Sequence, residues 1–333
     1  MKIINDLCLI WRNPKFYLLF LLLVISLLIP FFQISIYLMH VLILTFFFIG
    51  YSSSWNLLAY SGQVSFGHAA FLGIGAYVTT LFTIQTSLPF IGILMGAIVS
   101  AFVGFFIGLT CVRLREWFLA LVTFGFSIIM IALTIELDWL TGGTLGLTVP
   151  KLFPSINQYQ YYFYYYYVML TLAVFLVLLF HFITRSKVGL AFAAIRENES
   201  EAKATGIDVV KYRLLAFTIS AFFTGLMGAF YAHFIGYINH QIYSPENSFW
   251  PIIISVIGGL ATLEGPVIGS LLRFLIYEFL RIIEPWVRTI GPGMVTIYPK
   301  MQVLLFGAIL VVVIILMPKG IAPWLRKFLM SGR

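Results

Sequence analysis

Charge is scarce in this chain. Asp, Glu, Lys and Arg make up 10% of its 333 residues, and 61% of the residues are hydrophobic; soluble proteins carry about 25% charged residues. A chain with so little charge uses lipid as its solvent, where helices satisfy their own backbone hydrogen bonds. The sequence therefore predicts an all-α polytopic membrane protein. Its net charge of +8 reports on membrane topology, and nucleic acid is not expected as a partner.

Three further absences exclude classes of function. The two cysteines, Cys8 and Cys111, lie far apart and form neither a disulfide framework nor a metal site. The five histidines show no ligand spacing, so no metal or other cofactor is expected. No GxxxxGK[ST] loop occurs, so the chain cannot bind nucleotide phosphates by that route, and any ATPase that acts with it is another polypeptide. The chain is expected to be a non-catalytic subunit rather than an enzyme.

Apolar runs long enough to cross a bilayer recur along the chain. We expect about 8–10 transmembrane helices, since about 20 apolar residues span the hydrocarbon core. The expected segments cover about 16–33, 36–58, 66–86, 89–112, 117–137, 214–237, 249–262, 265–283 and 300–317, together with a sixth segment that begins with the tyrosine-rich run Tyr159 to Tyr167. The segment at 249–262 is short for a crossing and is either a half-helix or a tilted span. A stripe of small residues in the fourth segment favours close helix packing over a direct role in function: Gly92, Gly96, Ser100, Gly104 and Gly108.

One long charged stretch, Arg185 to Arg213, interrupts this pattern. It holds six basic and four acidic residues of the 20 Lys and Arg and 12 Asp and Glu in the chain. Its apolar residues recur at helical spacing, which predicts a short helix. Asn198 followed by Glu201 predicts the start of a second helix, and Gly206 its end. We expect a loop of two short helices with a mixed-charge face; an ordinary solvated loop is the alternative.

The positive-inside rule orients the chain. Placing the loop at 185–213 and both termini in the cytoplasm puts 15 of the 20 Lys and Arg residues there. The extracytoplasmic loops are then all short. We expect a single transmembrane domain over 1–333, with the loop at about 185–213 as its cytoplasmic projection.

Two glycine-broken passages occur, one in each half of the chain. The first runs from Gly62 to Ala76, and the second from Gly258 to Gly269. Interrupted helices in both halves are typical of transporters, because exposed backbone groups at the break can bind polar solutes. His68 lies within the first passage, where an ionisable group needs a partner; it is either a hydrogen-bonded packing residue or part of the pathway.

Four passages resemble the LivH/LivM family, the permease subunits of branched-chain amino-acid ABC importers. They are Gly62 to Tyr77, Leu140 to Leu147, Gly189 to Gly206 and Ile257 to Gly269, and the likeness spans most of residues 45–320, nearer the LivM side. ABC permeases commonly carry an EAA-then-Gly loop that docks in a groove of the ATPase. Glu201-Ala202-Lys203 with Gly206 only approximates that pattern, which leaves individual residue roles there open.

The resemblance implies roles for two groups of residues. The substrate pathway would include Gly62, Gln63, Ser65, Phe66, Gly67, His68, Gly258, Gly259 and Gly265. Coupling to the ATPase would involve Arg196, Glu197, Asn198, Glu199, Ala202 and Gly206.

The resemblance also implies partners and a location. The partners would be ABC ATPase subunits, a second LivH-like permease, a soluble substrate-binding protein and the lipid bilayer. The protein would be a multi-pass component of a bacterial plasma (inner) membrane. A hetero- or a homodimeric permease pair fits the sequence.

Several functions fit the residues themselves. The resemblance implies import of branched-chain or other hydrophobic amino acids, but urea permeases look similar, and an uncharged pathway fits a zwitterion and a short amide equally well. An ion-coupled secondary carrier would need titratable groups in the membrane, and these are scarce. A membrane-embedded enzyme would need a clustered nucleophile, metal or acid pair, and none is visible.

Overall fold

The computed structural model describes residues 23–288 apart from 112, 113, 115 and 155, together with 304, 307–308, 311–312, 315, 317 and 320–324. Residues 16–22 of the first predicted span (about 16–33) and most of the last one (about 300–317) lie outside these residues. The helices are η1 (Ile29–Phe32), α3 (Ile36–Tyr60), α4 (His68–Thr86), α5 (Pro89–Cys111), α6 (Glu116–Glu136), α7 (Asp138–Thr141), α8 (Gln158–Arg185), α9 (Lys187–Glu197), α10 (Glu199–Ala204), α11 (Val209–Ile235), η2 (His240–Tyr243), α12 (Pro245–Gly258) and α13 (Gly265–Arg288).

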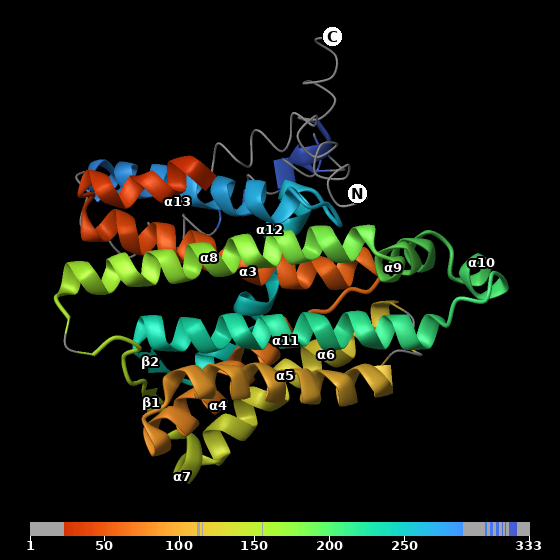
Figure 1. Cartoon of the computed structure of the whole chain (residues 1–333), viewed down its shortest axis with the longest axis horizontal. Coiled ribbons are helices and arrows are strands. Elements are labelled where there is room, and N and C mark those ends of the chain that lie inside the picture. The colour runs from red at the N-terminus through yellow and green to blue at the C-terminus, as the bar shows by residue number, and fades with distance from the viewer. Residues whose placement is uncertain are drawn as a thin grey trace, which may run out of the picture.

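Six helices of the described part are long and apolar enough to cross a membrane: α3, α4, α5, α6, α8 and α11. The strands β1 (Leu147–Thr148) and β2 (Tyr237–Ile238) have two residues each and pair antiparallel. This confirms the all-α polytopic class. In Figure 1, α8 and α11 run lengthwise, with α9 and α10 at one end and the two strands at the other.

The segment predicted at 249–262 corresponds to helix α12, whose boundaries lie four residues closer to the N-terminus. Its 14 residues extend about 21 Å at 1.5 Å per residue, which is shorter than a hydrocarbon core of about 30 Å. Pro245 begins the helix and Ser244 caps it by accepting a hydrogen bond from the Asn247 amide. The half-helix alternative therefore holds.

The stripe of small residues on α5 packs against α4 and α11. All five of its residues are buried. A Cβ added to Gly96 would lie 2.6 Å from the Gly75 carbonyl of α4, and one added to Gly104 would lie 2.3 Å from the Ala221 side chain of α11. The three helices thus approach closely because no larger side chain stands between them, which confirms the packing interpretation.

The tyrosine run that begins α8 supplies hydrogen-bond donors to carbonyl groups at helix ends. The Tyr166 hydroxyl donates to the Ser26 carbonyl at 2.6 Å. That carbonyl lacks its usual partner four residues on, since Pro30 has no N–H. Tyr161 donates likewise to the carbonyls of His233 and Phe234, in the last turn of α11. A membrane offers such carbonyls little water, so the hydroxyls explain part of the unusual tyrosine density.

Candidate functional site

The predicted loop contains two helices, α9 and α10, joined at Asn198. The Asn198 side chain accepts hydrogen bonds from the amides of Ser200 and Glu201 and donates to the Glu201 carboxylate at 2.6 Å. At the other end of α10, the Ile207 amide donates to the Ala202 carbonyl while Gly206 adopts a φ of +85°. Both signals that predicted the ends of this helix are confirmed, as an Asn198 N-cap and a C-terminal Schellman motif.

The loop is attached to the membrane helices through an ion-pair network. Glu199 pairs with Lys203 at 2.6 Å and with Arg213, near the start of α11, at 3.0 Å. The Lys203 hydrogen bond, supported by Arg213, lowers the pKa of the Glu199 carboxyl below its usual value. The Arg196 guanidinium lies 4.9 Å from the ring centre of Tyr60, the last residue of α3. Of the predicted coupling residues, Glu197 is exposed, whereas Ala202 is buried in the small core of the loop.

The first glycine break, residues 61–67, lies directly against this loop. The buried Gln63 side chain donates to the Arg213 carbonyl at 2.9 Å and to the Ser61 hydroxyl at 2.9 Å. Gly62 has a φ of +79°, and a Cβ there would lie 3.0 Å from the Arg196 Cα. The structure thus brings the predicted pathway residues Gly62 and Gln63 into contact with the predicted coupling loop.

His68, at the start of α4, is completely held by hydrogen bonds. The Ser220 hydroxyl of α11 donates to the Ser54 carbonyl, so it accepts from His68 Nε2 at 2.8 Å. With its proton on Nε2, the neutral imidazole accepts at Nδ1 from the Ser65 hydroxyl, at 3.0 Å, and the same hydroxyl accepts from the Gly67 amide. This assignment corresponds to a neutral imidazole with its proton on Nε2. Among the alternatives for His68, the packing role is the one that these contacts support.

Two adjacent residues of α3, Trp55 and Asn56, form hydrogen bonds with the two breaks. The Trp55 indole donates to the Ser65 carbonyl of the first break at 2.8 Å. The Asn56 amide donates to the Thr262 carbonyl at 2.7 Å and accepts from the Ala261 amide at 2.8 Å, in the second break. In this second break, residues 259–264, the Thr262 hydroxyl also bridges the Gly259 carbonyl and the Gly265 amide. One turn of α3 therefore links both passages, although no direct hydrogen bond joins one break to the other in the described part of the chain.

Sequence reasoning missed the residues that make these attachments. Trp55, Asn56, Thr123 and Arg213 contact a break, and Ser220 contacts His68 directly after the first one. Among these residues, only the polar run Tyr51 to Asn56 carried a signal. Three serines and an asparagine in an apolar helix are costly in lipid unless they are paired. This cost could have identified α3 as the element that the breaks contact.

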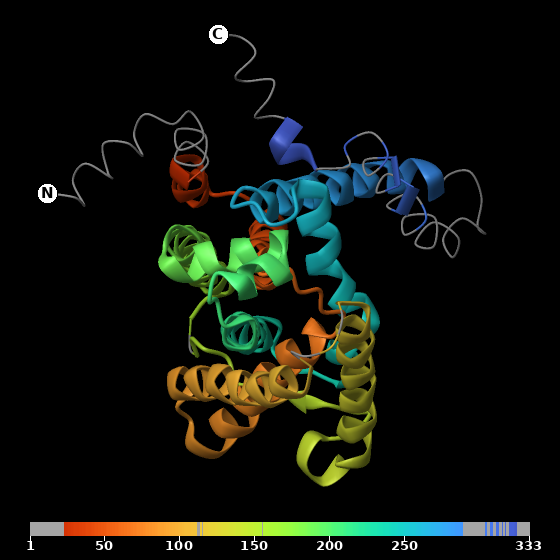
Figure 2. The same cartoon turned by 90° about the vertical axis from the view of Figure 1, so that its right-hand side faces the viewer.

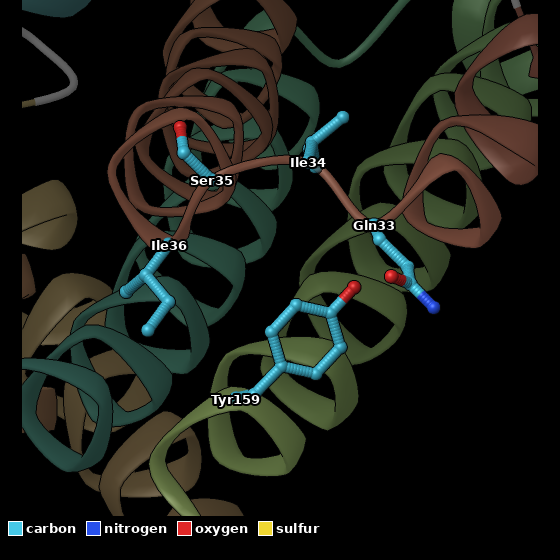
Figure 3. A pocket seen from close by; sticks show the side chains of 5 residues that line it. All are labelled: Gln33, Ile34, Ser35, Ile36 and Tyr159. Atoms are coloured by element: carbon cyan, nitrogen blue, oxygen red, sulfur yellow. The ribbon is translucent and has the colours of Figure 1, made fainter.

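A shallow pocket of about 430 Å³ lies near the start of α3, at the end of that helix opposite the first break. Its lining residues are Gln33, Ile34, Ser35, Ile36 and Tyr159 (Figure 3). The Ser35 hydroxyl caps α3 by accepting from the Leu38 amide, and the Tyr159 hydroxyl donates to the Pro30 carbonyl. The Ser35 and Tyr159 hydroxyls are thus used in local structure, and none of the predicted site residues lines the pocket.

Comparison with known proteins identifies the family. Residues 36–314 match the family described as "Branched-chain amino acid transport system / permease component". Relatives include the high-affinity branched-chain amino acid transport system permease protein LivM of Salmonella typhimurium, 27% identical over 291 residues, and that of Escherichia coli, 26% identical over 296 residues. Each alignment covers 80% of this chain and 65% of the relative.

A third relative is archaeal. The probable branched-chain amino acid transport permease protein LivM of Methanocaldococcus jannaschii is 22% identical over 271 residues, which cover 76% of this chain and 78% of the relative. No solved structure gives a significant match. Since the family match covers well over half of the sequence, this chain belongs to the family of permease components of branched-chain amino acid transport systems.

Proposed function

We propose that this chain is the membrane-spanning permease subunit of an ATP-driven importer for branched-chain or other hydrophobic amino acids. The family match supplies the class of protein. The observation that carries the mechanism is the contact between the α9–α10 loop and the first glycine break, through Arg196 against Gly62 and through Gln63 on the Arg213 carbonyl. A push on the loop would reach the break directly.

The proposed assembly contains further chains. A related permease would complete the pathway, and two ATPase subunits would lie below the permease pair, one of them against the exposed face of this loop. A soluble binding protein would deliver solute to the opposite face. The chain would act as one permease unit in a bacterial plasma membrane with both termini in the cytoplasm. It would catalyse no covalent chemistry itself, because ATP hydrolysis belongs to the partner.

Reconstitution tests this function. The chain, co-expressed with its ATPase, second permease and binding protein, is placed in vesicles, and uptake of labelled leucine is measured with and without ATP. We expect uptake that needs ATP and does not respond when ion gradients are collapsed. Uptake that follows an ion gradient without ATP would show a secondary carrier, and ATP-dependent uptake of urea alone would show an amide permease.

The loop provides a specific variant for the same assay. Glu197 is exposed and, among the described residues, makes no ion pair, whereas Arg196 and Glu199 are packed against Tyr60 and Arg213. Glu197→Arg should therefore weaken ATPase binding without disturbing the loop, while Arg196→Ala should loosen the contact with the break. Unchanged pull-down of the ATPase by the Glu197 variant would remove this residue from the docking face.

A further inference from the structure

Three phenylalanines from three separate elements gather beside the first break. The Phe249 ring of α12 lies 5.5 Å from that of Phe66, in the break, and 6.3 Å from that of Phe124, on α6. None of the three is fully buried. We call Phe66, Phe124 and Phe249 the phenylalanine cluster.

Polar contacts next to each ring hold the cluster in place. The Phe66 amide donates to the hydroxyl of Thr123, the residue before Phe124, at 3.0 Å. The Ser248 hydroxyl, one residue before Phe249, accepts from the Ala69 amide at 3.1 Å. Thr123 and Ser248 are themselves completely buried. The rings are therefore positioned by hydrogen bonds among the break, α6, α4 and α12 and not by ring contacts alone.

A carboxylate lies one helical turn from the cluster. Glu246 precedes Phe249 by three residues on α12, so both side chains lie on one face of the helix. Glu246 is exposed, and no ion pair to it forms within the described part of the chain. Glu246 lies within electrostatic range of Tyr277, on α13, but an exposed carboxylate suits the membrane interior only where it meets water or a cation.

The depth of Glu246 in the membrane can be inferred from a hydrogen bond made by the next residue, Asn247. The Asn247 carbonyl accepts a hydrogen bond from Tyr51, nine residues before the end of α3. At 1.5 Å per residue this is about 14 Å from that end, near the middle of a hydrocarbon core of about 30 Å. Figure 2, viewed from the α9–α10 end, shows α12 and α6 along one side of the molecule, with the connection from α3 to α4 running towards them.

We propose that Glu246 and the phenylalanine cluster form a binding site for the transported solute, with Glu246 holding its ammonium group and the rings holding a branched hydrocarbon side chain. The inference rests on the proposed function and names the residues that would contact the amino acid. The half-helix start at Pro245 places the carboxylate at mid-membrane, and the clamped break places the rings within reach of the same solute.

Cysteine labelling separates this site from a lipid-facing surface. Phe124→Cys and Phe249→Cys are made in a chain with Cys8 and Cys111 replaced by serine, within the assembled transporter. Ile129→Cys is the control, since Ile129 is 55% exposed and lies in the middle of the same helix as Phe124. Maleimide reacts with the thiolate, which forms in water and not in lipid. We expect both cluster positions to react at least tenfold faster than the control, and to be protected by leucine supplied with its binding protein.

The outcomes are distinct. Labelling as slow as at Ile129 would place the rings in lipid and overturn the site, as would labelling that leucine does not slow while the parent transports leucine. Absence of ATP-dependent uptake in the parent would overturn the proposed function instead. Glu246→Gln adds a second measurement: loss of a charged hydrogen bond should lower leucine uptake about tenfold while Glu246→Asp retains most of it. Equal uptake by the glutamine variant would exclude Glu246 from the site.

Discussion

Tyrosine hydroxyl groups of α8 complete the hydrogen bonding of backbone carbonyls in a neighbouring segment of this protein. Tyr159, Tyr166 and Tyr167 donate to the carbonyls of Pro30, Ser26 and Leu27, which come from the segment before α3. A carbonyl without a partner costs more in a bilayer than at a water-exposed surface. The tyrosines thus join α8 to a neighbouring segment through hydrogen bonds that a phenylalanine could not make.

The replacement Tyr166→Phe tests this role. Removing the hydroxyl leaves the Ser26 carbonyl without its donor, so the free energy of unfolding should fall by about 1 kcal/mol. Tyr164→Phe is the control, because Tyr164 is 46% exposed on the same helix; its change should stay within about 0.5 kcal/mol. Unfolding by denaturant in detergent micelles measures both values. Equal stabilities for the two variants would show that the Ser26 carbonyl finds another donor.

At the level of elements, the short helix α10 depends on its ends. Six residues are too few for a stable isolated helix, so the cap at Asn198 and the turn at Gly206 carry much of its stability. The space around Gly206 is open, with nothing within 4 Å of an added Cβ, so the demand on this residue comes from its backbone conformation alone.

The replacement Gly206→Ala tests how much α10 depends on the left-handed backbone conformation of this residue. An L-residue at a φ of +85° costs about 1–2 kcal/mol, so amides of residues 199–207 should exchange hydrogen about five- to thirtyfold faster. Gly125→Ala is the matched control: Gly125 also has open space around it, but it lies inside α6, where alanine is the better helix former. Hydrogen exchange followed by mass spectrometry measures both. No acceleration in the Gly206 variant would mean that α10 does not need the left-handed turn.

Helix ends and helix faces could be predicted from the sequence, whereas the partners of those faces could not. Asn198 and Gly206 predicted the ends of α10 because capping depends only on residues next to the helix end. The stripe on α5 predicted a close helix contact because the spacing of its small residues is visible within one segment. The Gln63 contact with Arg213 joins residues 150 positions apart, and nothing in either segment encodes the other. For the same reason the sequence showed two breaks but not that adjacent residues of α3 hold them.

At the scale of the whole molecule, the structure places the charged loop and the β1–β2 ribbon at opposite ends of the long helices (Figure 1). Together with the positive-inside rule, this predicts that the two ends lie on opposite sides of the membrane. Ser200→Cys, in α10, and Leu145→Cys, just before β1, should therefore react with a membrane-impermeant maleimide from opposite faces. Both residues are exposed.

The face from which each cysteine reacts is measured in right-side-out and in inverted vesicles that contain the chain with Cys8 and Cys111 replaced. We expect Leu145→Cys to react from the outside and Ser200→Cys from the inside. Reaction of both from one face would contradict the orientation, and with it the assignment of the loop as the ATPase side.

The attachment of the two breaks to Trp55 and Asn56 limits where the protein can tolerate insertions and deletions. Each residue inserted into an α-helix rotates everything beyond it by about 100°. An insertion between Trp55 and Tyr60 would turn the first break away from Arg196, and one between Trp55 and Asn56 would uncouple the two breaks from each other. Insertions and deletions that keep a working transporter should therefore avoid this turn of α3 and collect in connections such as 149–157.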